Sequence, residues 1–281
     1  MHRPPLDKGG RRVDLHAHTL YSDGVLTPEA VVARALERSL AALAITDHDS
    51  VEAVEPARIA AGSNLELVPG IEVSSSLNGM DLHILGYYID PEDEELVRAL
   101  ARFRDERLRR AMTMARKLGE LGAPVDFEVV LELAGPGVVG RPHVAEALVR
   151  AGHVETVDEA FRRFIGAQGE AFVPRPSFRP EDAISLVHAA RGVSVLAHPG
   201  MSLPDSVIEE LAGAGLRGLE VWHPQHGALA VRRFRALARR LDLLETGGSD
   251  FHGWPRGTEL GELPVPASVL GPLKQAAGVP G

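Results

Sequence analysis

The chain has no cysteine, few aromatic residues and no excess of positive charge. Without cysteine it can form neither disulfides nor thiolate sites, so any metal site must use His, Asp and Glu. Aromatic residues make up 5% of the chain, which predicts an aliphatic core. Lys and Arg number 30 against 39 Asp and Glu, a formal charge of −9. This balance argues against a broad basic groove for long nucleic acid.

Long apolar runs are also missing. The longest, residues 40–45, is far shorter than a membrane span. Residues 1–12 lack the apolar segment of a signal peptide. We therefore expect a cytoplasmic protein with no membrane partner. The length of 281 residues, with 44% hydrophobic and 25% charged residues, fits one large α/β domain with a small insertion.

Short apolar runs that end in polar residues recur along the chain and predict buried strands. These runs are residues 12–15, 43–45, 65–68, 71–73, 82–87, 193–197, 219–221 and 243–246. Helical patterns separate several of them; one begins where Thr27 provides an N-cap and Pro28 the first helical residue. The alternation of strands and helices favours a parallel sheet.

The middle of the chain shows a different pattern. A long helical pattern over residues 92–121 is followed by shorter ones, and no strong strand intervenes before about residue 171. We interpret residues 92–168 as a helical insertion domain, and residues 1–91 with 169–281 as a discontinuous barrel domain. The first helix of the insertion is rich in Arg, which indicates either a solvated face or a surface for an anionic substrate. Residues from 262 onward are rich in Pro and Gly and predict a loose tail.

Metal-ligand residue types gather at the predicted strand ends. His16 and His18 are two residues apart, a spacing that directs both side chains of a strand to one side. Glu72 lies in an otherwise apolar strand, where an unpaired carboxylate is costly. His48 lies between two Asp residues directly after a strand, where a cation would offset repulsion and desolvation. The combined pattern predicts a multinuclear metal centre.

Together these motifs resemble the PHP (polymerase and histidinol phosphatase) family. They are VDLHAH at 13–18, SDG at 22–24, TDHD at 46–49, PGIE at 69–72, HILGY at 83–87, AHP at 197–199 and GSDFH at 248–252. The resemblance implies a distorted (β/α)7 barrel with a helical insertion. It also implies three divalent ions, with Mn²⁺ preferred and Fe²⁺ or Zn²⁺ as alternatives.

The resemblance further implies which residues hold the ions. The implied ligands are His16, His18, Asp23, His48, Glu72, His83, His198, Asp250 and His252. The first ion would be held by His16, His18, Glu72 and Asp250. Glu72 would bridge to a second ion that is also held by His83 and His198. Asp23, His48 and His252 would hold the third ion, and Asp250 and His198 would also take part in catalysis.

The sequence GRPHVA at 140–145 resembles the stand-alone bacterial branch of the family. That branch acts on nucleoside 3′,5′-bisphosphates and on the 5′ ends of short RNA or DNA. The implied reaction is attack of a metal-activated hydroxide on phosphorus. Arg141 and His143 are the candidate phosphate-binding residues, Arg141 also with a catalytic role, and Arg175 is a weaker candidate. The alternative for Arg141 is a salt bridge at a helix start.

Other interpretations stay open at this point. A phosphatase of small metabolites, such as histidinol phosphatase, is the main alternative. A catalytically inactive scaffold is disfavoured by the complete ligand set, and an amidohydrolase with two metals is disfavoured because no strand carries the lysine that it needs. Asp47 or Asp49 could support a ligand histidine, or form an N-cap or turn. His223 and His226 match no family motif and are expected at the surface or behind the ligands. A monomer is favoured.

Overall fold

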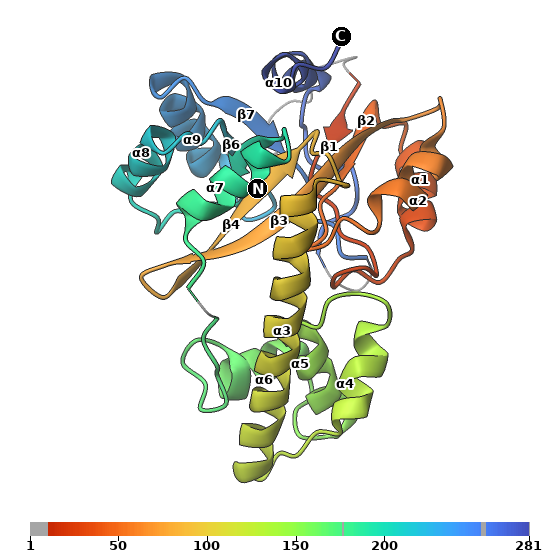
Figure 1. Ribbon diagram of the computed structural model, residues 1–281, viewed down its shortest axis with the longest axis vertical. Helices are drawn as coiled ribbons and strands as arrows, with labels where there is room; N and C mark the ends of the chain where they lie inside the picture. The colour runs from red at the N-terminus through yellow and green to blue at the C-terminus, as the bar shows by residue number, and fades with distance from the viewer. Residues whose placement is uncertain (1–10, 176, 254–256, 281) are drawn as a thin grey trace.

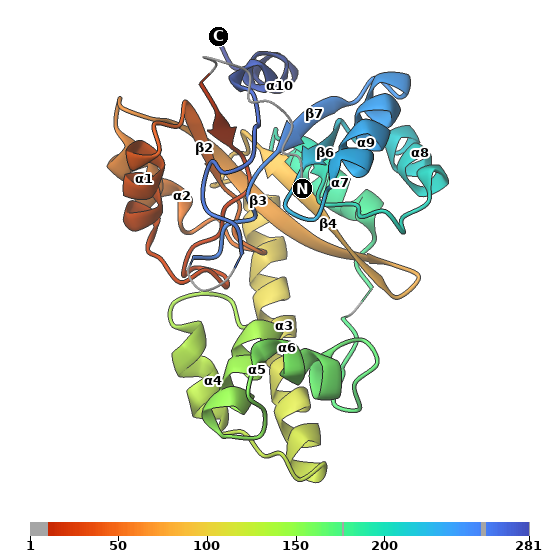
Figure 2. The same cartoon turned by 180° about the vertical axis from the view of Figure 1, so that it is seen from behind.

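The computed structural model describes residues 11–175, 177–253 and 257–280. Seven strands form one sheet in chain order, nearly closed into a barrel (Figures 1 and 2). They are β1 (Val13–Asp14), β2 (Ala42–Ile45), β3 (Glu66–Leu77), β4 (Met80–Tyr87), β5 (Val193–Leu196), β6 (Gly218–Trp222) and β7 (Leu244–Gly247). The end of β7 returns to β1, where the Leu15 N–H donates to the Gly247 carbonyl at 3.1 Å. The predicted (β/α)7 barrel is confirmed.

Helices surround this barrel and form a lobe beneath it. Around the barrel lie α1 (Pro28–Glu37), α2 (Val54–Ala61), α7 (Pro180–Ala189), α8 (Asp205–Gly213), α9 (Ala228–Arg240) and α10 (Leu270–Ala277). The lobe contains α3 (Glu94–Glu120), α4 (Phe127–Ala134), α5 (Arg141–Arg150), α6 (Val157–Ala160) and a π-helix (Phe161–Ile165). As predicted, Thr27 caps α1 by accepting from the Ala30 N–H, and Pro28 is its first residue. Every helix among the described residues is too short or too polar to span a bilayer.

The sheet is mixed, which corrects the prediction of a parallel sheet. Strand β4 runs antiparallel to both β3 and β5. The cause is local: Asn78 and Gly79 join β3 to β4 with φ angles of 52° and 80°. Two consecutive residues with positive φ form the tight turn typical of a hairpin, and so short a connection leaves no room for a crossover helix.

The predicted loose tail is wrong over its second half. Residues 270–277 form α10, whose Leu270 and Leu273 are buried in a core cluster that also contains Val13 and Val265. Two leucines three residues apart lie on one helical face, and their burial outweighs the Pro and Gly content of the segment.

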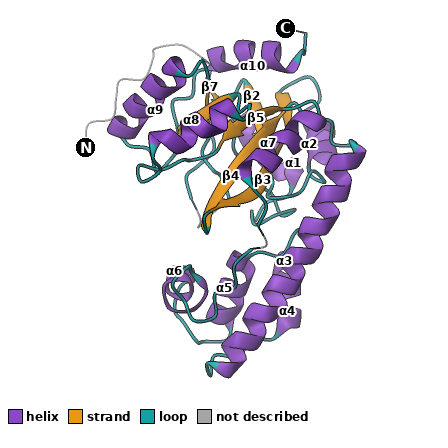
Figure 3. Ribbon diagram, turned by 60° about the vertical axis from the view of Figure 1, so that its left-hand side comes forward, coloured by secondary structure: helices purple, strands orange, loops and turns teal. Residues whose placement is uncertain are grey.

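Helix α3 connects the barrel to the lobe (Figure 3) and contributes residues to the cores of both. Its first half packs Leu96, Leu100 and Phe103 into the core beneath β3 and β4. Its second half contributes Met114 and Leu118 to a separate core that is drawn from residues 111–171. Both cores are mainly aliphatic. The division into a barrel domain and an insertion at residues 92–168 stays a prediction, since one continuous helix is shared.

Candidate metal centre

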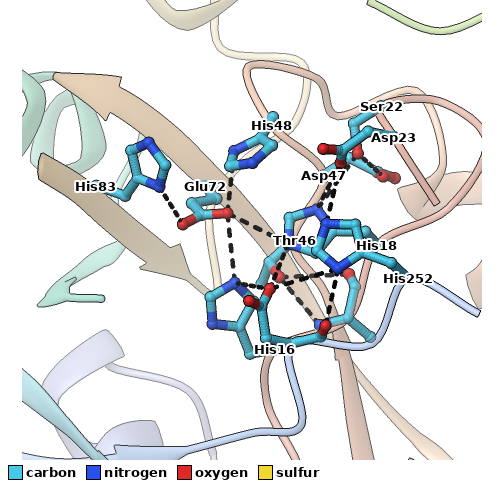
Figure 4. Close-up of polar contacts among 12 residues, drawn as sticks. His16, His18, Ser22, Asp23, Thr46, Asp47, His48, Glu72, His83 and His252 are labelled. Atoms are coloured by element: carbon cyan, nitrogen blue, oxygen red, sulfur yellow. Dashed lines mark hydrogen bonds and ion pairs between the residues drawn. The ribbon is translucent and has the colours of Figure 1, made fainter. Parts of the chain in front are cut away.

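The nine predicted ligands all lie at one end of the barrel (Figure 4 shows seven of them labelled). Seven follow the carboxyl ends of parallel strands, which meet at one edge of such a barrel. Glu72 lies within β3, and His83 lies near the start of β4 opposite Ser74. Because β4 is antiparallel, its beginning reaches the same end of the barrel as the ends of its parallel neighbours.

Glu72 is the centre of the cluster and is fully buried. Its Oε2 lies 3.3 Å from His16 Nε2, 3.2 Å from His18 Nε2 and 3.0 Å from His48 Nδ1. Its Oε1 lies 2.8 Å from His83 Nδ1 and 2.9 Å from His198 Nε2. The two oxygens therefore face two different sets of imidazoles, which is the arrangement that a bridging carboxylate requires.

Asp250 completes the first of these sets. Its Oδ1 lies 3.3 Å from His16 Nε2 and 3.2 Å from His18 Nε2. Asp250 thus adjoins His16 and His18, and the ligand atoms of these two histidines and of Glu72 lie within 4.8 Å of one another. Close approach of β7 to β1 makes this possible: a Cβ on Gly248 would lie 2.3 Å from the His16 backbone nitrogen.

The third predicted set lies on the other side of His18. His252 Nε2 is 3.2 Å from Asp23 Oδ1, and the His18 and His252 rings stack with centroids 4.3 Å apart. Ligand atoms of His18, Asp23, His48 and His252 all lie within 4.8 Å of one another. His48 also groups with Glu72 and His83, so it lies between two predicted ion positions. The structure brings the nine residues together, and their partition among three ions stays a prediction.

The donor set fits divalent cations. Six imidazoles and three carboxylates lie together, three of these residues buried and six half-buried, and the His83 Nε2 has no hydrogen-bond partner. Burial would lower the pKa of His18, but Asp250 and Glu72 outweigh it and raise this pKa to about 10. Without a cation, a proton thus compensates the carboxylates, and a metal ion would displace it. Mixed His and carboxylate sites suit Mn²⁺, Fe²⁺ and Zn²⁺.

Behind the ligands lies a carboxylate that the sequence analysis does not predict. Glu220 is fully buried in β6; it lies 2.9 Å from His16 Nδ1 and accepts from the His198 backbone N–H at 2.7 Å. The signal that singles out Glu72, a carboxylate within an apolar strand, applies equally to Glu220 and could have found it.

Asp47 and Asp49 support the segments that carry the predicted ligands. Asp47 accepts from the Thr19 N–H at 2.7 Å and from the Ser22 hydroxyl at 2.5 Å. Ser22 Oγ also lies 3.3 Å from His18 Nδ1, so Asp47 acts on this ligand through Ser22. Asp49, by contrast, has its hydrogen bonds with the backbone of β3 and with Arg107 of α3.

An arginine-rich pocket adjoins the metal centre. It is lined by Asp49, Ser74, Phe103, Arg107, Arg110 and Arg175, together with Glu106 and Phe178. Ser74 follows Glu72 by two residues on β3, and Asp49 follows His48, so the pocket lies next to the cluster.

Two guanidinium groups of this pocket are incompletely satisfied. Arg110 Nη2 and Arg175 Nε are buried without a hydrogen-bond partner. Burial and the neighbouring arginine charges lower the pKa of Arg110 to about 9 and that of Arg175 to about 10. Arg107 is better compensated, because its Nη2 lies 2.6 Å from Asp49 Oδ2. A bound anion would accept hydrogen bonds from the unpartnered N–H groups and offset the repulsion among the arginines.

Arg141 and His143 lie at the start of α5, and the charge of Arg141 is near Arg110 and Arg175. Arg141 Nη2 is 2.9 Å from Asp81 Oδ2, so the salt bridge considered as the alternative is present. His143 is buried, and its Nδ1 accepts from the Gly140 N–H in the helix cap. The phosphate-binding role of both residues stays a prediction.

Comparison with known proteins identifies the family. The PHP domain family matches residues 14–165. Over 267 residues the chain is 37% identical to the 5′-3′ exoribonuclease Rnm of Escherichia coli, covering 92% of this chain and 91% of the relative. The chain belongs to the PHP family. A second relative of this PHP protein is the 3′,5′-nucleoside bisphosphate phosphatase of Chromobacterium violaceum, 34% identical over 85% of this chain and 87% of the relative.

A solved structure agrees with this identification. A Bifidobacterium adolescentis protein assigned as a metal-dependent phosphoesterase superposes with a TM-score of 0.89 at 33% identity, covering 98% of both chains. The predicted enzyme class of the PHP protein, a metal-dependent phosphoric ester hydrolase, is confirmed.

Proposed function

We propose that this PHP protein hydrolyses phosphate esters of nucleotides, as a nucleoside 3′,5′-bisphosphate phosphatase, a 5′-3′ exonuclease on short oligonucleotides, or both. The observation that carries the proposal is the arginine pocket directly beside the metal cluster. A phosphate at the cluster and a second phosphate at the arginines would be recognised together. The activities of the two relatives support the same substrate class.

The proposed cofactor is a set of three divalent ions, with Mn²⁺ foremost. Glu72 would bridge two ions, His16, His18 and Asp250 would complete the first site, and the remaining predicted ligands would complete the other two. Such ions lower the pKa of water and stabilise charge on phosphoryl oxygens. The number of ions and their identity are part of this proposal.

The chain's own residues would orient the substrate. Arg110 and Arg175 offer unpartnered N–H groups to an anion, and charge-assisted hydrogen bonds of this kind are the strong ones. Arg141 would have to exchange Asp81 for a phosphate oxygen, so its contribution requires that this ion pair opens. The expectations of a monomer and of a cytoplasmic location stay predictions.

Phosphate release by the Mn²⁺-loaded protein tests the substrate class. Adenosine 3′,5′-bisphosphate, AMP and histidinol phosphate are compared side by side. We expect a strong preference for the bisphosphate, and Arg141→Ala should weaken this substrate more than AMP. Arg150→Ala is the matched control, because Arg150 ends the same helix and is exposed. Preference for histidinol phosphate would contradict the proposal and favour a phosphatase of small metabolites.

A further inference from the structure

Strand β6 carries none of the nine predicted ligands, yet it lies between two strands that do. It pairs with β5, which leads to His198, and with β7, which leads to Asp250. Both of these ligands have positive φ angles, 24° for His198 and 50° for Asp250. Residues other than glycine rarely adopt this region, so the surrounding structure must hold them there.

Glu220 of β6 holds two ligands at once. Its Oε1 accepts the proton of His16 Nδ1 at 2.9 Å, and its Oε2 accepts the His198 N–H at 2.7 Å. A proton on Nδ1 leaves the lone pair of His16 on Nε2, the atom that faces Glu72 and Asp250. Glu220 thereby selects the metal-binding tautomer of one ligand and fixes the strained backbone of another.

His223, directly after β6, positions a third predicted ligand, Asp250. Its side chain is only 2% exposed, and its Nδ1 accepts from the Gln225 N–H at 3.2 Å. The proton of His223 must therefore be on Nε2, which donates to Asp250 Oδ2 at 3.3 Å. This bond occupies Oδ2 and leaves Oδ1 directed to His16 and His18.

We propose that Glu220 and His223 are positioning residues for the metal centre: β6 determines which atoms of His16, His198 and Asp250 face the ions. The inference rests on the metal centre proposed above. Partners of metal ligands orient the ligand and fix its tautomer, and their loss typically weakens metal binding by about 10–100-fold.

Mn²⁺ binding to the metal-stripped full chain, measured by calorimetry, tests His223. We expect His223→Leu to weaken Mn²⁺ binding by about 10–100-fold. His223→Gln should stay within about threefold of the wild type, because its amide can place a donor where Nε2 lies. The side chain of His223→Asn is too short to place its amide donor at the position of Nε2, so this variant should behave like His223→Leu. It replaces the leucine variant in the test if that variant does not fold.

His226→Leu is the matched control. His226 is buried three residues further on; its side-chain Nδ1 bonds to the Val221 carbonyl, and its Nε2 has no hydrogen-bond partner among the described residues. This variant should bind Mn²⁺ as the wild type does. The thermal midpoint of each metal-stripped variant shows whether a loss of binding is merely a loss of fold.

Glu220→Gln, with Glu245→Gln of β7 as its control, tests the other residue. An amide can accept at only one of the two positions, so we expect Mn²⁺ affinity to fall by about 10–100-fold in Glu220→Gln only. Wild-type affinity in His223→Leu or Glu220→Gln, or equal losses in His223→Gln and His223→Leu, would overturn the inference. Failure of the wild type itself to bind Mn²⁺ would instead overturn the proposed function.

Discussion

Replacing Arg175 by Met tests whether the positive charge of the arginine pocket, which would bind an anion, lowers the free energy of unfolding of the protein. Burial and the charge of Arg107 lower the pKa of Arg175 from 12.5 to about 10. At neutral pH the group is charged in both the folded and the unfolded chain, so this difference disfavours folding by about 3 kcal/mol. Because Arg175 is only partly buried, solvent screening reduces the expected gain on removing the charge to about 1–2 kcal/mol.

Urea unfolding of the metal-stripped protein measures this gain as a higher midpoint at an unchanged m-value. The same substitution should raise the KM for adenosine 3′,5′-bisphosphate by about 10–100-fold, since a hydrogen bond to a charged group contributes about 1.5–3 kcal/mol. The KM for a substrate with a single phosphate should change little. Arg179→Met is the control, because Arg179 is exposed and pairs with Glu181. An Arg175→Met protein less stable than the wild type would refute the reasoning.

Three further predictions follow from the contacts of the site. Asp250→Asn should lower Mn²⁺ affinity by more than about 100-fold, measured as metal content after dialysis; wild-type content would contradict its assignment as a ligand. Asp49→Asn should destabilise the protein by about 3 kcal/mol in urea unfolding, because Arg107 loses its buried partner, and Asp105→Asn, at an exposed pair, should cost under about 1 kcal/mol. Burial would raise the pKa of Asp49, but Arg107 and Arg175 outweigh it and hold this pKa at about 2, below its ordinary 3.8. The stabilisation is therefore present above pH 3.8 and lost toward pH 2, so the gap between wild type and Asp49→Asn should close on acidification; a gap that persists at pH 2 would contradict the pair. Chelation should lower the thermal midpoint, and Mn²⁺ at 100 times its Kd should restore about 3 kcal/mol; an unchanged midpoint would contradict metal binding by the folded state.

The barrel could be predicted because its strands are short apolar runs that end in polar residues. The direction of β4 does not follow from the alternation of strands and helices, since its antiparallel course depends on the two-residue turn at Asn78 and Gly79. An Asn-Gly pair between apolar runs is the local signal for such a hairpin. Helix α10 could not be predicted from local composition. The Pro and Gly content of this segment predicts a tail, but Leu270 and Leu273 pack into a core formed by residues from distant parts of the barrel.

Most of the ligand cluster could be predicted because metal-ligand residue types follow the ends of apolar strands, whereas His83, which lies within β4, is included through the resemblance to the PHP family. The supporting contacts of the cluster could not be predicted, because they join distant segments. The Arg141 partner Asp81 lies 60 residues away in the chain, on the hairpin of β3 and β4, and no local pattern indicates it. The tautomer of His223 likewise depends on a backbone N–H whose direction only the folded loop determines.

We propose that the nine-residue cluster holds divalent ions that phosphate ester hydrolysis requires. Phosphate release from adenosine 3′,5′-bisphosphate, followed as Mn²⁺ is added to metal-stripped protein in known ratio to the chain, tests this most directly. We predict no release without metal and a rise in rate up to three equivalents. Full release by the stripped protein, or a rate that saturates at one equivalent, would contradict it.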